Sequence, residues 1–322
     1  MPARPFTALI IVLIALITGG CTNAASAPLT ARSTSTSAGT STSGGTSRTG
    51  TVSPHVIIHM VTFIDASRSL KYPHHHVVPR SLVTVIRYPA AVAGPLPLIV
   101  FGHGFAVTPA DYYRLLTAWA QAGYVVAAPV FPLENAHAPG GPDEADLVNQ
   151  PADMSFVITG MLALAAQRRS FLAGRISPGR IGISGQSDGG ETALAMAYDR
   201  SYRDPRVRAA AILSGAQLPS SQAGSFPRPS PPLLATQGTA DMTNRPHFTY
   251  DFFRAATRPK YLLRLLGAGH LAPYTTQQPQ LSIIERVTTG FFDRYLKGER
   301  AGETAMAKTG NVRGLAALTA VP

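Results

Sequence analysis

Cysteine and charged residues are scarce in this sequence. Its 322 residues include one cysteine, and only 14% are charged. A single cysteine excludes a disulfide bond within the chain and a cysteine-based metal site. The formal net charge is +11, but no run of basic residues is longer than a pair. Proteins that bind nucleic acid gather their basic residues in clusters, so we expect no nucleic-acid partner.

Long apolar runs are missing as well. The stretch from residue 6 to 17 is apolar except for Thr7, and it is shorter than the roughly 20 residues that a membrane-spanning helix needs. Basic Arg4 precedes it and two glycines follow it, an order typical of a signal peptide. We therefore expect the protein to be exported.

The lone Cys21 follows these glycines directly. Residues 1–21 thus resemble a bacterial lipoprotein signal, which implies that Cys21 carries a lipid and anchors the protein to the outer face of the cell membrane. Thr18 departs from that pattern, where Leu, Val or Ile is usual. The alternative is an ordinary signal peptide and a fully secreted protein.

The chain changes character twice after this signal. Residues 22–53 contain 17 serines and threonines among 32 residues and have no apolar period, so we expect a disordered tether. From about residue 54 short apolar runs alternate with helical patterns up to the C-terminal region. This alternation predicts one α/β domain over 54–322, with a mainly parallel sheet and helices on both faces.

Eight strands and four helices are expected in this domain. The strands are His55–Ile64, Leu82–Tyr88, Leu96–Phe101, Tyr124–Ala128, Arg180–Ser184, Arg208–Ser214, Leu233–Thr236 and Tyr261–Leu266. The helices are Ala110–Ala122, Ala152–Arg169, Gly189–Tyr198 and Leu281–Lys297, the last of which is expected to close the domain.

The motif Gly-x-Ser-x-Gly at residues 185–189 lies between a predicted strand and a predicted helix. This is the setting of a nucleophile elbow, in which a strained turn presents the serine, here Ser187. Glycines at 185 and 189 leave room for the turn, and the helix N-terminus offers backbone N–H groups to an oxyanion. The string alone is weak, because it also occurs by chance in ordinary turns.

A second glycine-rich loop, Gly102-His103-Gly104-Phe105, follows the strand at 96–101. Such a loop supplies the other donor of an oxyanion hole, so we expect the N–H groups of Phe105 and Asp188 to form it. We expect His103 to shape the loop through hydrogen bonds rather than to act as a base. The aromatic side chains of Phe105, Tyr112 and Tyr113 are candidates to contact an acyl chain.

An acid and a base follow in the order that a serine hydrolase of this kind needs. Asp241 and His270 each lie on a loop after a predicted strand, so the order is Ser187, Asp241, His270. A serine hydroxyl needs a base to remove its proton, and the base needs an acid to orient it. Because histidine has an ordinary pKa of about 6.5, activity is expected to rise between about pH 6 and 7.

The segments IVFGHGF, ISGQSDGGETA, ATQGTADMTNRP and LLGAGHLAPY resemble the α/β-hydrolase superfamily. Within it, the dienelactone-hydrolase and platelet-activating-factor-acetylhydrolase-like esterases are the most similar, and the resemblance covers roughly residues 57 to 297. It implies a Ser–His–Asp hydrolase with no metal or organic cofactor. Two departures are Gln186, where many relatives have histidine, and a connection before the strand at 233–236 too short for a large cap. We expect Gln186 to pack behind the elbow, and the active site to be open.

Several residues compete for these roles. Asp204 and Asp251 are alternatives to Asp241 as the acid, and His247 is the alternative to His270 as the base. The tract His74–His76 suggests a metal site, but no cysteine or carboxylate stands at ligand spacing, so a solvated loop is favoured. The long acidic segment 133–149 is expected to border the substrate cleft.

The sequence therefore predicts an exported, monomeric serine ester hydrolase. Its substrate is a small-molecule, lipid or polymeric ester, and its only membrane contact is the N-terminal lipid. Two alternatives stay open: an acyltransferase with the same three residues, and a surface lipoprotein that binds without turnover.

Overall fold

The computed structural model describes residues 11–14, 54–72, 77–217, 226 and 228–322. The predicted lipid attachment at Cys21, the predicted tether 22–53 and the tract His74–His76 lie outside the described residues, as does most of the predicted signal.

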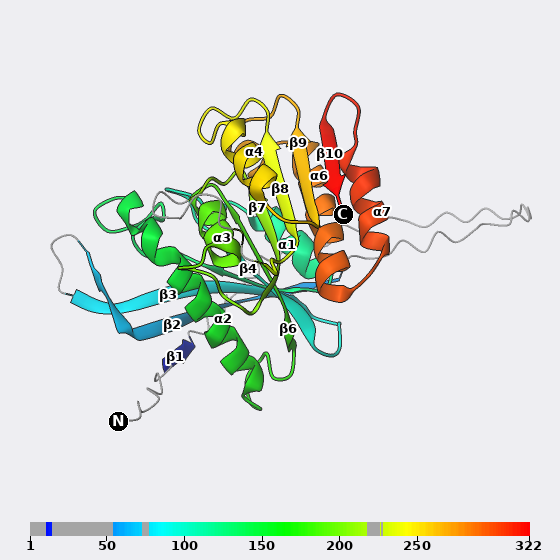
Figure 1. Ribbon diagram of the computed structural model, residues 1–322. Coiled ribbons are helices and arrows are strands. Elements are labelled where there is room, and N and C mark those ends of the chain that lie inside the picture. The colour runs from blue at the N-terminus through cyan, green and yellow to red at the C-terminus, as the bar shows by residue number, and fades with distance from the viewer. Residues whose placement is uncertain (1–10, 15–53, 73–76, 218–225, 227) are drawn as a thin grey trace, which may run out of the picture. The chain divides into compact units, whose positions relative to one another are not determined.

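One mixed sheet forms the framework of the described chain (Figure 1). Its order is β1-β2-β3-β5-β4-β6-β7-β8-β9-β10, and the six neighbours from β5 to β9 run parallel. The antiparallel pairs are β1 with β2, β2 with β3, β3 with β5, and β9 with β10. The strands are β1 (Ile11–Ile14), β2 (Val56–Lys71), β3 (Val77–Pro89), β4 (Leu96–Gly102), β5 (Val125–Pro129), β6 (Ile176–Gln186), β7 (Val207–Leu213), β8 (Leu233–Gly238), β9 (Lys260–Leu265) and β10 (Ala316–Val321). The mainly parallel α/β sheet predicted from the sequence is confirmed.

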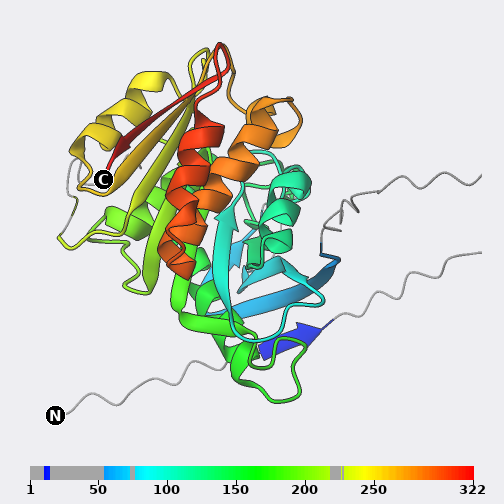
Figure 2. The same ribbon diagram turned by 90° about the vertical axis from the view of Figure 1, so that its right-hand side faces the viewer.

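Helices cover both faces of this sheet, because its central strands are apolar on both sides. Residues of β4 and β5 alternate between two hydrophobic cores: Leu98 and Val100 lie in one core, Ile99 and Phe101 in the other. The helices are α1 (Tyr113–Gln121), η1 (Glu144–Asn149), α2 (Gln150–Ala166), α3 (Asp188–Tyr198), α4 (Pro246–Ala255), α5 (Ala272–Thr275), α6 (Gln280–Phe292), η2 (Asp293–Lys297) and α7 (Ala301–Gly310). Helices α2, α3 and α4 contribute to the first core, and α1, α6 and α7 to the second. Figure 2 shows α6 and α7 lying side by side against the strands. No helix in the described part of the chain is long and apolar enough to cross a membrane.

The C-terminal part of the fold differs from the prediction. We expected the helix Leu281–Lys297 to close the domain, but α7 follows it, and β10 then pairs antiparallel with β9 along its whole length. Most residues of β10 are partly or fully exposed, so this edge strand lacks the continuous apolar pattern of the central strands. This strand forms by pairing with β9, and its own sequence pattern does not predict that pairing.

The fold brings four loops to one edge of the sheet. The parallel strands β4, β6, β8 and β9 run in the same direction, so the loops that follow them lie at the same edge of the sheet. These loops carry the predicted oxyanion residues, Ser187, Asp241 and His270. Four short segments that are far apart in the sequence thereby lie at one edge of the sheet, where they form one site.

Candidate active site

Ser187 occupies a strained turn between β6 and α3. Its backbone angles are φ 54° and ψ −123°, a combination that residues other than glycine rarely adopt. The close packing of this turn explains its glycines, because a Cβ at Gly185 would overlap the carbonyl group of Gly189, and one at Gly189 would overlap that of Gly102. The prediction that only glycine fits at 185 and 189 is confirmed. The serine side chain is held in one place, and its residue is only 6% exposed.

His270 joins Ser187 to Asp241. Its Nε2 lies 2.8 Å from Ser187 Oγ, and its Nδ1 lies 2.8 Å from Asp241 Oδ2. With a proton on Nδ1, the histidine donates to the carboxylate and accepts the serine proton on Nε2. This is the geometry that a general base needs beside a hydroxyl nucleophile.

Asp241 is buried, and its two oxygens have partners on every side. Backbone N–H groups of Thr243 and Asn244 donate to Oδ1 at 2.9 and 3.0 Å. Oδ2 accepts from the side-chain amide of Gln237 at 3.1 Å, besides its contact with His270. A carboxylate held by this many donors keeps a fixed orientation toward the histidine.

The predicted oxyanion loop lies beside the nucleophile. A Cβ at Gly104 would be 3.1 Å from Ser187 Cβ, so the loop backbone passes close to the serine. In the described chain, the N–H groups of Phe105 and Asp188 donate to no other group. Two such donors beside the serine oxygen suit a developing negative charge.

His103 supports this loop and takes no part in the Ser187 contacts. It is fully buried; its Nδ1 donates to the carbonyl of Gly104 at 2.8 Å, and its Nε2 accepts from the N–H of Phe131 at 2.9 Å. Burial lowers its pKa to about 4, so the ring is neutral at pH 7. The prediction that His103 shapes the loop is confirmed.

Gln186 and Tyr112 belong to the site, which the sequence did not predict. Gln186 donates from Nε2 to the carbonyl of His270 at 3.1 Å, and this nitrogen lies 3.3 Å from the imidazole Nε2. Its Oε1 accepts from the Tyr112 hydroxyl at 2.6 Å, and that hydroxyl accepts from the N–H of Gly104 at 3.3 Å. The expectation that Gln186 packs behind the elbow is therefore incomplete, because its amide contacts the histidine. Tyr112 is fully buried, so it is not available to an acyl chain, whereas Phe105 is 42% exposed.

The competing residues lie elsewhere. Asp204 forms an ion pair with Arg206 and accepts from the hydroxyl of Ser155. Asp251 is paired with Arg254 on α4. His247 is exposed and contacts only the neighbouring Phe248 ring among the aromatic pairs of the described chain. None of the three contacts Ser187.

Carboxyl groups surround the elbow. Burial, with the charge of Asp188, raises the pKa of Glu191 to about 8. The segment 133–149, predicted to border the substrate cleft, contacts the oxyanion loop, since the N–H of Ala106 donates to the carbonyl of Glu134 at 2.9 Å. Part of that segment is not a loop but the 3₁₀ helix η1. In the described ranges, no group of three His, Cys, Asp or Glu side chains is arranged to hold a metal.

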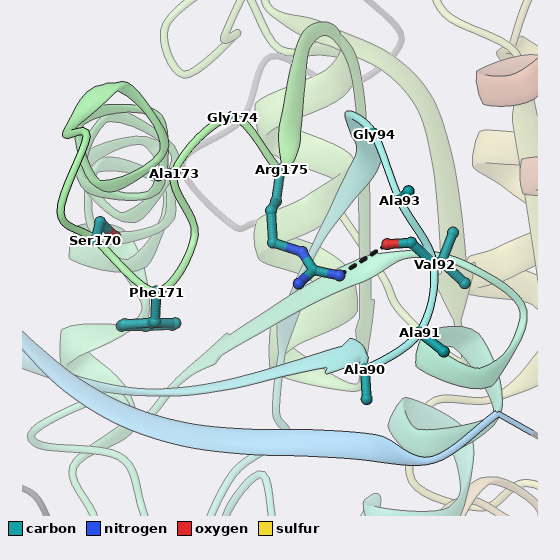
Figure 3. Close-up of a pocket in the computed structure, with 10 residues that line it drawn as sticks. All are labelled: Ala90, Ala91, Val92, Ala93, Gly94, Ser170, Phe171, Ala173, Gly174 and Arg175. Carbon is teal, nitrogen blue, oxygen red and sulfur yellow. Dashed lines mark hydrogen bonds between the residues drawn. The ribbon is translucent and has the colours of Figure 1, made fainter.

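A pocket of about 420 Å³ lies at the opposite edge of the sheet (Figure 3). It is formed by residues 90–94 and 170–175, next to the first residues of β4 and β6. The Arg175 guanidinium donates to the carbonyls of Pro89 and Val92 and so ties its two walls together (Figure 3). This pocket is separate from Ser187, which follows the last residue of β6.

Residues 58–217 match the family model described as Chlorophyllase. This range includes Phe105, Ser187 and Asp188 and ends before Asp241 and His270. No curated protein matches the sequence. The match supports the α/β-hydrolase superfamily expected from the sequence, while the narrower resemblance to dienelactone hydrolases and platelet-activating-factor acetylhydrolases stays a prediction. The chain has the α/β-hydrolase fold, and its residues 58–217 are similar to the Chlorophyllase family, a hydrolase family of esterase type.

Proposed function

We propose that this protein is an exported serine hydrolase that cleaves carboxylic esters through an acyl-enzyme on Ser187. The hydrogen bonds from Ser187 to His270 and from His270 to Asp241, each 2.8 Å long, are the observation that carries this proposal. Proton transfer uses both contacts, because the histidine takes the serine proton and the aspartate orients the histidine. The similarity to an esterase-type family agrees with this chemistry.

In the first half of the reaction, Ser187 Oγ attacks the ester carbonyl carbon while His270 Nε2 takes the serine proton. Asp241 stabilises the resulting imidazolium through its hydrogen bond to Nδ1. The carbonyl oxygen becomes an oxyanion that accepts hydrogen bonds from the N–H groups of Phe105 and Asp188, each worth about 3 kcal/mol. His270 then gives its proton to the leaving alcohol, the C–O bond breaks, and the acyl group stays on Ser187.

In the second half, His270 removes a proton from water, whose oxygen attacks the acyl carbon. Collapse of the second tetrahedral intermediate breaks the bond to Ser187 Oγ, and His270 returns the proton to that oxygen. A carboxylic acid leaves and the enzyme is restored. An acyltransferase would differ only in using another alcohol in place of water.

The surroundings of the site favour esters with an apolar part. Phe105 on the oxyanion loop is 42% exposed, and Met242, directly after Asp241, is 76% exposed. Exposed apolar side chains on two loops of the site can bind an acyl chain or a polymer segment by burial of apolar surface. We propose a small-molecule, lipid or polymeric ester as substrate, and the name of the matched family adds chlorophyll to the esters to be tried.

The test is hydrolysis of p-nitrophenyl esters with acyl chains of two to twelve carbons by the full-length chain. Ser187→Ala should abolish turnover, whereas Ser201→Ala, the same change at an exposed serine, should not. Mass spectrometry after treatment with a fluorophosphonate should find the label on Ser187. A folded wild-type protein that is neither labelled nor active would favour the binding lipoprotein, and ester formation with an added alcohol would favour acyl transfer.

We also propose that residues 1–21 direct export and that Cys21 carries the lipid anchor, with 22–53 as a tether. The order of basic, apolar and small residues before the only cysteine supports this. In a bacterial host, the wild type should partition with membranes and incorporate labelled fatty acid. Cys21→Ser should do neither, and fatty-acid labelling that survives this change would refute lipidation at Cys21.

A further inference from the structure

A buried carboxyl group that the proposed mechanism does not use lies beside the elbow. Glu134 is fully buried, and the nearby carboxyl group of Asp188 raises the pKa of its side chain. Its Oε2 accepts from the side-chain amide of Gln150, which in turn accepts from the hydroxyl of Thr192 on α3. Glu134 Oε1 and Asp188 Oδ2 are both buried, and neither has a hydrogen-bond partner in the described chain. Two bare carboxylates close together repel each other, whereas a single proton shared between these two oxygens would satisfy both.

The backbone of Glu134 makes a second contact with the site. Its carbonyl accepts from the N–H of Ala106 at 2.9 Å. Ala106 directly follows Phe105, whose N–H is one proposed oxyanion donor, and Asp188 supplies the other. Glu134 is thus bonded to the oxyanion loop through its backbone, and its side chain lies near the side chain of Asp188 on the elbow.

We propose that Glu134, as a neutral carboxylic acid, is a positioning residue that joins the two halves of the oxyanion hole. Its Oε1–H donates to Asp188 Oδ2 on the elbow, and its carbonyl accepts from Ala106 on the oxyanion loop. This inference rests on the proposed function, because it assigns a role within the same site.

The surroundings of Glu134 keep the proton in place. Burial first, and then the charge of Asp188 on α3, raises the pKa of Glu134 to about 10, and Asp146 and Glu144 on η1 act in the same direction. The group facing it from α2, Gln150, is uncharged. Arg80, a buried cation on β3, is engaged by Asp146 and Asp153, with contacts of 2.5 and 2.6 Å.

The proton also matters for the reaction itself. An oxyanion forms next to the N–H of Asp188, and a second full negative charge on the carboxyl pair would oppose it. Sharing one proton leaves the pair with a single negative charge and an attractive contact. Loss of that proton above about pH 10 would add repulsion and release the elbow from the loop.

The test compares Glu134→Gln with Glu134→Leu in the full-length chain, with Glu299→Gln as the matched change at an exposed glutamate outside the site. Glutamine can donate to Asp188 and accept from Gln150, so kcat at pH 8 should stay within about 3-fold of the wild type. Leucine keeps the size but not the hydrogen bonds, and kcat should fall by about 100-fold, the loss typical of one oxyanion donor, with little change in KM. The decline of wild-type kcat above about pH 10 should be absent in Glu134→Gln.

Equal losses in the two Glu134 variants, unchanged kcat in Glu134→Leu, or the same decline at high pH in Glu134→Gln would each overturn the inference. If Glu134→Leu does not fold, the high-pH comparison of Glu134→Gln with the wild type decides.

Hydrogen exchange separates this inference from the proposed function. The peptide containing residues 103–107 should exchange faster in Glu134→Leu than in the wild type, and at the wild-type rate in Glu134→Gln. This readout needs no turnover. A wild type as inactive as Ser187→Ala would refute the esterase, whereas equal exchange in all three proteins would refute only the role of Glu134.

Discussion

Acid should destabilise this protein through His103. Its ring is fully buried and neutral, with one nitrogen donating to Gly104 and the other accepting from Phe131. Because burial lowers its pKa to about 4, the folded state binds this proton less readily than the unfolded chain, whose histidines titrate near 6.5. The unfolded state therefore holds more protons over this window, and stability is lost as pH falls through it.

The size of the effect follows from the two pKa values. Between pH 7.5 and pH 5 the free energy of unfolding should fall by about 2 kcal/mol from His103 alone, and by about 3 kcal/mol when pH reaches 4. Other groups also titrate in this range, so the quantity to compare is the difference between the wild type and His103→Gln. Glutamine can donate and accept hydrogen bonds but has no proton to gain.

Urea unfolding at a series of pH values measures this difference. Trp119 is the only tryptophan and is fully buried, with its Nε1 donating to Thr288 at 2.8 Å, so its fluorescence reports unfolding of the core. The stability advantage of the wild type over His103→Gln should shrink by about 2 kcal/mol between pH 7.5 and pH 5. An advantage that is constant over this range would show that His103 is not held neutral in the fold, and the reasoning would fail.

Four further outcomes are expected. Asp241→Asn should lower kcat by about 10⁴-fold through the wrong histidine tautomer, while Asp251→Asn should leave it unchanged; a small effect of the first would remove Asp241 from the mechanism. Arg80→Met should cost about 3–5 kcal/mol in urea unfolding, because buried Asp146 loses the one cation paired with it among the described residues and Asp153 keeps only Arg68; a loss under 1 kcal/mol would contradict this. Gly185→Ala should abolish activity and lower the melting temperature, since its Cβ has no room at the elbow, and an active, stable variant would disprove the close packing. Glu134→Gln should gain stability relative to the wild type as pH rises from 5 to 9, because the raised pKa of Glu134 makes the folded state bind more protons than the unfolded chain; parallel stability curves would refute this.

The sequence by itself determined the fold class and the principal site residues. Short continuous apolar runs such as 96–101 specify strands buried on both faces, and several of them are followed by a helical pattern. The placement of Ser187, Asp241 and His270 directly after such strands was enough to predict that they meet, because parallel strands end at one edge. Each of these signals lies within one short segment of the sequence, so it can be recognised without the tertiary structure.

Only the tertiary structure decided which polar side chains surround those residues. The contacts of Gln186 with His270, of Tyr112 with Gln186, and of Glu134 with Asp188 join residues 54 to 84 positions apart. The pairing of β10 with β9 is likewise fixed by packing and not by its own pattern. The physical reason is that burial decides the charge and the partners of a side chain: the same carboxyl is an ordinary acid on the surface and a neutral hydrogen-bond donor at position 134. That environment exists only after the chain has folded.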